Sequence, residues 1–135
     1  MQLNKITFEK QINKATEYLD EKKNVKAEKF LKKIIAKSPY NEEAMLLLGI
    51  ANRRLGFLKK AIDCFKKTTE LNRSMEEAWG LLTITYIDHG NLNLAKRTIE
   101  RARELNPNNT TILYLQQNLI QTYVKYGPFF DINQK

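Results

Sequence analysis

Few residues in this sequence have the types and spacing that chemistry needs. The only histidine, His89, follows Asp88 and precedes Gly90, so a single carboxylate accompanies it. Zinc sites use three or four ligands, which this pair does not supply. The sequence contains no HExxH, no CxxC and no glycine-rich phosphate loop. We therefore expect no catalytic residue, no metal site, no cofactor and no enzymatic activity.

The only cysteine is Cys64, so an intramolecular disulfide is excluded. The chain is therefore not a disulfide-stapled secreted domain. We expect Cys64 to be a small buried or half-buried side chain rather than a reactive thiol. If the thiol were exposed, Lys60 and Lys67 would lower its pKa.

Apolar segments are too short for a membrane span or a signal peptide. The longest uninterrupted apolar run, Ala44 to Ala51, has eight residues, whereas a spanning helix needs about 20. Residues 1–11 contain Lys5, Glu9 and Lys10 and lack the apolar core of a signal peptide. We therefore expect no membrane span and a cytoplasmic protein.

The formal net charge of +8 is concentrated in the first half of the chain, where seven lysines lie between Lys22 and Lys37. A solvated outer face is the simpler interpretation of these cations. A surface for nucleic acid or for an anionic membrane is the alternative. Because we expect the basic face to lack interleaved aromatic residues for base stacking, we predict against nucleic-acid binding.

The sequence repeats with a period of about 34 residues, within the range typical of repeat architectures. Shifting it by one period places Met45 on Trp79, Leu48 on Leu82, Gly56 on Gly90, Ala61 on Ala95 and Leu71-Asn72 on Leu105-Asn106. A fixed period in this range indicates stacked supersecondary units.

Each repeat contains two stretches with helical apolar spacing. In the third repeat we expect helices at about 75–88 and 93–105, in line with that spacing. Ser74-x-x-Glu77 predicts a capping box at the first of them. Gly90 supplies the positive φ that ends a helix, and Asn106-Pro107 ends the second. Short turns between such helices predict antiparallel hairpins.

The repeated residues resemble the tetratricopeptide repeat (TPR) family. Trp79, Leu82, Tyr86, Ala95 and Pro107 match its pattern. The second repeat departs from it at Asn52, Thr68 and Arg73, and the first repeat keeps only Tyr18, Ala27 and Pro39.

The resemblance implies an all-α fold, an α-solenoid of three TPR helical hairpins plus a C-terminal capping helix. We predict a single domain over 1–126, with repeats at about 8–41, 42–75 and 76–109 and a capping helix at 110–126. Gly127-Pro128 is expected to end that helix and to leave a tail over 127–135.

The resemblance further implies that the first helix of each repeat lines a concave groove. Carried over position by position, the predicted partner-binding residues are Ile12, Leu19, Leu46, Leu47, Ile50, Arg53, Arg54, Leu81, Ile84, Ile87 and Tyr114. Exposed apolar residues in such number are typical of an interaction site. The alternative is that they only pack between adjacent first helices.

One TPR subfamily grips a C-terminal carboxylate with Lys, Asn and Arg in this groove. The corresponding positions here are Ile12, Thr16, Leu47, Glu77 and Leu81, so we expect no such clamp. An apolar groove beside Arg53 and Arg54 favours an amphipathic helix or an extended segment with apolar anchors.

We therefore expect a protein-interaction module or adaptor whose ligand is a protein or peptide. A secretion-type chaperone for an apolar client segment is a narrower version, and nucleic-acid binding through the basic convex face is the rival. Self-association through the groove or through the tail that carries Phe129 and Phe130 is a further alternative. The sequence does not identify the partner, because one fold serves many ligands.

Overall fold

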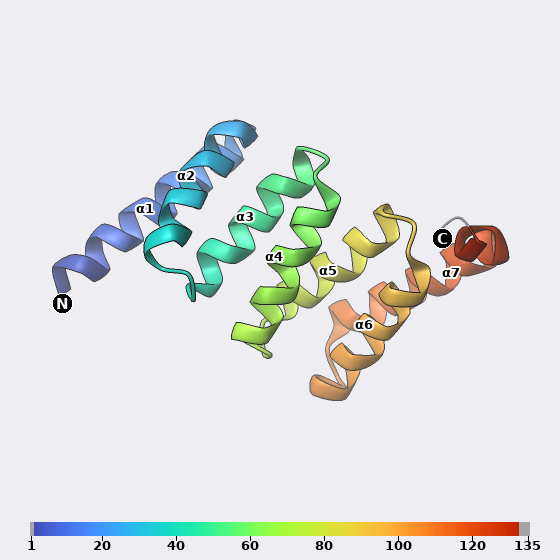
Figure 1. Ribbon diagram of the computed structural model, residues 1–135. Helices are drawn as coiled ribbons and strands as arrows, with labels where there is room; N and C mark the ends of the chain where they lie inside the picture. Colours follow the sequence, from blue (N-terminus) through green and yellow to red (C-terminus); the bar gives the residue numbers. More distant parts are fainter. Residues whose placement is uncertain (1, 133–135) are drawn as a thin grey trace. The chain divides into compact units, whose positions relative to one another are not determined.

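The computed structural model describes the backbone of residues 2–132 and the side chains of residues 5–119, 121 and 125 (Figure 1). Over this range the chain forms seven helices and no strand. They are α1 (Gln2–Asp20), α2 (Asn24–Lys37), α3 (Glu42–Arg54), α4 (Leu58–Leu71), α5 (Glu76–Asp88), α6 (Leu92–Leu105) and α7 (Thr110–Ile132). The predicted all-α fold class is confirmed, and the two helices expected in the third repeat lie within one residue of their predicted bounds.

The chain divides into two compact units, Met1–Leu71 and Asn72–Lys135. Unit 1 consists of two antiparallel hairpins, α1–α2 and α3–α4, and α3 also packs on α2 and α1. Its core contains Ile12, Leu19, Leu31 and Leu48 together with the fully buried alanines of the repeat. Tyr18 and Phe30 join α1 to α2 through an edge-to-face ring contact with centroids 5.8 Å apart.

Gly49 allows the close approach of α3 and α4. A Cβ at this position would lie 2.5 Å from Cε1 of Phe65, whose side chain is fully buried. Only a residue without a side chain therefore fits between the α3 backbone and the Phe65 ring.

Unit 2 contains the hairpin α5–α6 and helix α7, which packs on both of them. Trp79 holds the start of α5 in place, because its indole Nε1 donates a hydrogen bond of 3.0 Å to the carbonyl oxygen of Arg73. At Gly80 the α5 backbone meets α7, and a Cβ there would lie 3.2 Å from Cδ1 of Leu115.

The turns inside the hairpins share one backbone geometry. Gly56 and Gly90 have φ values of +84° and +82°, as their predicted helix-ending role requires. Lys22 occupies the same position of the repeat, one period before Gly56, and has φ +60°. This lysine adopts a left-handed conformation that costs less for glycine.

The turns between hairpins place an asparagine before the next helix. The side-chain oxygen of Asn41 accepts from Ala44 N at 2.8 Å, and that of Asn109 accepts from Ile112 N at 2.8 Å. Met75 lies at the equivalent position and makes no side-chain cap. The predicted capping box at Ser74 is therefore wrong, because the repeat register places Ser74 one residue too early.

The predicted end of the last helix is also wrong. Helix α7 continues through Gly127 and Pro128 to Ile132 and so crosses the predicted boundary at residue 126. Proline in a helix costs about 3 kcal/mol, a penalty that disfavours but does not forbid continuation. The side chains of Ile120, Phe129 and Phe130 lie outside the described residues.

Candidate functional site

Three of the predicted groove residues are buried. Ile12 is 3% exposed, Leu19 is 4% exposed and Leu46 is 6% exposed. Ile12 and Leu19 belong to the core of unit 1 with Ala44 and Leu48 of α3. Both side chains therefore lie inside the core of unit 1 and not on an exposed face.

The outward part of α3 consists of half-buried apolar side chains. Leu47 and Ile50 pack against the core of unit 1 from its edge and keep part of their surface exposed. Positions i, i+3 and i+7 of a helix share one face, so Leu47 and Ile50 lie on the same face as Arg54. Arg53 is half-buried on the adjacent face. We call this set the α3 surface.

Arg54 has a structural contact within unit 1. Its guanidinium donates a hydrogen bond of 2.8 Å to the carbonyl oxygen of Leu19, in the last turn of α1. Carbonyls at a helix C-terminus lack intrahelical partners, so a cation there is stabilising. The arginine predicted to face a ligand therefore spans from α3 to α1, and as a whole residue it is exposed.

Helix α5 carries a second apolar surface in unit 2. Leu81, Ile84 and Ile87 are half-buried, while Thr83 and Thr85 are buried. The two threonine hydroxyls donate to backbone carbonyls one turn earlier, at 2.9 and 2.6 Å. The helix thus satisfies its polar groups inward and leaves apolar side chains partly exposed. We call Leu81, Ile84 and Ile87 the α5 surface.

Tyr114, the predicted groove residue of the last helix, is 66% exposed on α7. Its neighbour Leu115 is buried at the contact with Gly80 on α5. Leu113, which precedes Tyr114, is 43% exposed. The predicted ligand-contacting role of Tyr114 and of the α3 and α5 surfaces stays a prediction.

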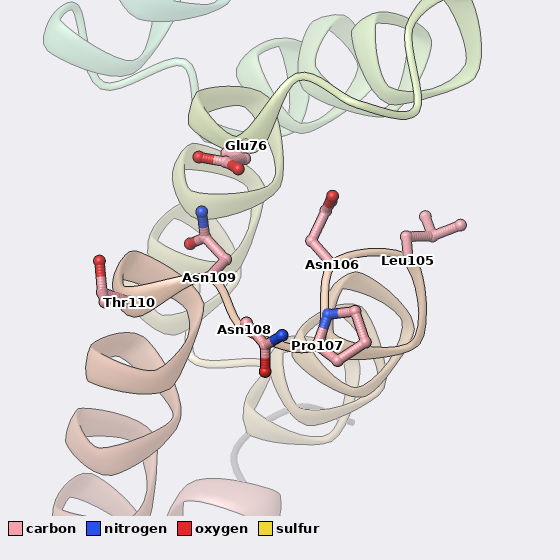
Figure 2. Close-up of a pocket in the computed structure, with 7 residues that line it drawn as sticks. All are labelled: Glu76, Leu105, Asn106, Pro107, Asn108, Asn109 and Thr110. Atoms are coloured by element: carbon pink, nitrogen blue, oxygen red, sulfur yellow. The ribbon is translucent and has the colours of Figure 1, made fainter.

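Unit 2 also has a polar hollow at the turn between α6 and α7 (Figure 2). Figure 2 shows the Asn109 side chain directed toward Glu76 at the start of α5. The other lining residues are Leu105, Asn106, Pro107, Asn108 and Thr110. The Asn106 amide nitrogen is buried there without a hydrogen-bond partner. The sequence indicated only a helix end at Asn106-Pro107, so this hollow was not predicted.

Cys64 is half-buried on α4, as the sequence predicts. Burial raises the pKa of its thiol to about 11, although a 3.8 Å contact from the Asn52 amide partly opposes this. The nearby lysines do not reverse the shift, so the thiol is protonated at neutral pH. A nucleophilic role would require the thiolate.

The other chemistry-bearing residues are dispersed. His89 is exposed and ends α5. Within the part of the chain that the structure describes, no three His, Cys, Asp or Glu residues come together as a metal site would require. Across the same residues, no helix combines the length and hydropathy needed to cross a bilayer.

Comparison with solved structures places this fold among TPR domains. The first TPR of Spaghetti (RPAP3), bound to the HSP90 peptide SRMEEVD, is 24% identical, with a TM-score of 0.76 over 87% of this chain and 93% of the other. The Yersinia enterocolitica type III secretion chaperone SycD, in complex with a peptide of the translocator YopD, is 16% identical, with a TM-score of 0.74 over 96% of this chain and 95% of the other. The Sgt2 TPR domain from Aspergillus fumigatus is 16% identical, with a TM-score of 0.78 over 89% of this chain and 80% of the other.

Sequence comparison gives the family itself. No curated protein matches the chain. The family described as the N-terminal TPR repeats region of Psidin matches residues 9–135. This match covers nearly the whole sequence, includes all three repeats and agrees with the helical hairpins and their turns. The chain therefore belongs to the TPR family, in the group described as the Psidin N-terminal TPR repeats region.

Proposed function

We propose that the chain is a protein-interaction module that binds a peptide or helix of a partner protein, with the α3 surface of unit 1 and the α5 surface of unit 2 as two separate candidate docking surfaces. This proposal rests on which side chains α5 buries and which it leaves partly exposed. This helix buries Thr83 and Thr85 and leaves Leu81, Ile84 and Ile87 partly exposed. Solubility alone favours the reverse arrangement, with polar side chains outward. Apolar surface that a helix keeps exposed is typical of docking sites.

The chemistry of the two surfaces favours a ligand with apolar anchors. The positions of a carboxylate clamp hold no lysine or arginine here, and Ile12, one of them, is buried. Two of the similar structures contain a peptide, the HSP90 peptide in one and the YopD peptide in the other. Without the clamp, an acidic C-terminal tail is the less suitable ligand. An apolar segment, as a secretion-type chaperone would hold, fits the Leu and Ile side chains better.

The test uses one substitution on each surface. Leu47→Asp and Ile84→Asp place a charge on half-buried positions, so both variants should fold. Leu46→Asp is unsuitable because Leu46 is 6% exposed and a carboxylate there would be buried. Peptides selected on the wild-type protein from a phage-displayed library of amphipathic sequences should lose at least about tenfold in affinity for the variant of the surface that binds them, as expected for one lost apolar anchor.

Matched controls are Val25→Asp on α2 and Leu113→Asp on α7, which alter apolar side chains that are 54% and 43% exposed outside these surfaces. They should bind the selected peptides like the wild type. Unchanged affinity in folded Leu47→Asp and Ile84→Asp variants would refute the proposal. Sedimentation of the wild type without peptide tests the predicted self-association separately.

A further inference from the structure

An aromatic ring lies beside a lysine at each end of helix α4. The Lys60 ammonium is 5.1 Å from the ring centroid of Phe57, which precedes the helix. The Lys67 ammonium is 5.8 Å from the ring centroid of Tyr40, which belongs to the turn between α2 and α3. Phe57 is 46% exposed and Tyr40 is 74% exposed. Both rings are therefore accessible to a ligand although each has a cation close by.

The two lysines beside these rings both belong to α4. Lys60 and Lys67 are seven residues apart and share one face of α4, about 10 Å apart along its axis. Lys59 and Lys66 are exposed on the adjacent face with the same spacing. The fold therefore brings aromatic rings to a lysine face that was expected to lack them, which removes the argument against nucleic acid.

The charge of the two units differs strongly. Residues 1–71 hold 16 Lys and Arg against 9 Asp and Glu, a net charge of +7. Residues 72–135 hold 7 against 6, a net charge of +1. Helix α2 adds five exposed lysines to those of α4, and only Lys32 among them has an observed acidic partner, Glu28 at 3.3 Å. The basic field of the chain thus belongs to unit 1 and favours a polyanion there.

We propose that the outer face of α4, with Phe57 and Tyr40 at its ends, is a binding surface for single-stranded nucleic acid. Two bases stack on the exposed rings, and the phosphates between them contact Lys60 and Lys67. Stacking accepts any base because every base has a π face, so the surface has little sequence preference. In a duplex the bases are stacked inside the helix, so only its phosphates can contact this surface, through the lysines.

The third repeat provides a natural comparison for this surface. Helix α6 is the counterpart of α4 and also carries exposed cations, including Lys96 and Arg97. The residues that correspond to Tyr40 and Phe57 are Ser74 and Asn91, so α6 has the charge without the rings. Asn91 instead caps α6 by accepting from Leu94 N at 3.0 Å.

The test measures binding of the full chain to short fluorescent oligo(dT) and oligo(rU) by anisotropy. Tyr40→Leu with Phe57→Leu should weaken binding about fivefold per ring, the low end for a lost stacked base, and leave the salt dependence unchanged. Lys60→Gln with Lys67→Gln should reduce the slope of log affinity against log salt by about 1.4, since each phosphate contact on a single strand contributes about 0.7.

Two further variants keep the proposal falsifiable. Asp63 is exposed on α4 within four residues of all four lysines, so Asp63→Asn should strengthen binding several-fold. Lys96→Gln with Arg97→Gln removes the same charge from α6 and should change affinity less than twofold if α4 is the site. Circular dichroism checks that every variant is folded, which their exposure leads us to expect.

Several results would overturn the proposal. One is that the chain does not bind the oligonucleotides at about 50 mM salt. Another is that the α6 control variant weakens binding as much as Lys60→Gln with Lys67→Gln does. The others are that Asp63→Asn binds with wild-type affinity, or that a duplex binds as tightly as single strands. Binding to phosphatidylserine vesicles or to polyglutamate but not to the oligonucleotides would assign the lysine face to a membrane or to an acidic protein instead.

Discussion

Replacing Lys22 by glycine should stabilise the protein. Lys22 has φ +60°, whereas its repeat equivalents are Gly56 at +84° and Gly90 at +82°. A left-handed conformation costs a residue with a side chain about 1–2 kcal/mol. Glycine removes this cost. Its greater conformational freedom in the unfolded chain, however, lowers the free energy of unfolding by about 0.4–1 kcal/mol. We expect a net stabilisation of about 0.5–1 kcal/mol for Lys22→Gly.

Two further variants isolate the backbone contribution. Lys22→Ala removes the same charge and side chain without relieving the positive φ, so it should have nearly wild-type stability. Gly56→Ala adds a methyl group that would meet no atom within 4 Å, so its effect comes from φ alone. It should destabilise the protein by about 1 kcal/mol.

Urea denaturation followed by circular dichroism measures all three variants. With a slope of about 2 kcal/mol per M, Lys22→Gly should raise the midpoint by about 0.25–0.5 M. Comparing midpoints at a common slope avoids errors of extrapolation. The reasoning fails if Lys22→Gly is no more stable than Lys22→Ala, or if Gly56→Ala unfolds at the wild-type midpoint.

Three further substitutions and one reaction test the packing, a helix cap and the electrostatics. Gly49→Ala should destabilise the protein. Overpacking against buried Phe65 costs about 1–3 kcal/mol, and the better helix propensity of alanine offsets only about 1 kcal/mol of it. In Gly80→Ala the new Cβ would lie 3.2 Å from its nearest atom, so this variant should be destabilised less than Gly49→Ala when both are measured by thermal melts. Equal melting temperatures of the two variants would contradict this. Asn41→Ala removes a helix cap and should cost about 1 kcal/mol in urea denaturation; no loss would mean that the cap is dispensable. At pH 8, Cys64 should react with iodoacetamide about 100-fold more slowly than an unfolded thiol, because burial raises its pKa from 9.0 to about 11. Its rate should rise steeply as the pH approaches that value, and a rate near that of the urea-unfolded protein at pH 8 would refute the burial argument.

The hairpin architecture could be read from the sequence because it repeats. Small residues and apolar positions return with the period, and the turn glycine returns in the second and third repeats. These are the features that local physics translates into helix bounds. The capping box and the end of the last helix were predicted from short local motifs instead, and both predictions were wrong. A serine one residue out of register and a single proline are weak signals.

The candidate surfaces were harder to predict because exposure depends on which helices meet. Ile12, Leu19 and Ile50 are equally apolar in the sequence, yet the first two are buried and Ile50 stays half-exposed. Helical spacing assigns a residue to a face but not to the neighbour that covers it. Phe57 directly precedes α4, so its place beside Lys60 follows from the sequence. Tyr40 lies in an earlier turn, far in sequence from Lys67, and only the folded hairpins bring its ring beside α4.

Helix α7 begins one full repeat period after α5, so the chain can be lengthened by design. A second copy of residues 76–109 inserted after Asn109 would keep the junctions Met75–Glu76 and Asn109–Thr110 and would add one new junction, Asn109–Glu76. Leu81 of the inserted copy would take the place of Leu115 and meet Gly80 as that leucine does now. The product would test how many hairpins α7 can close without any change to its own sequence.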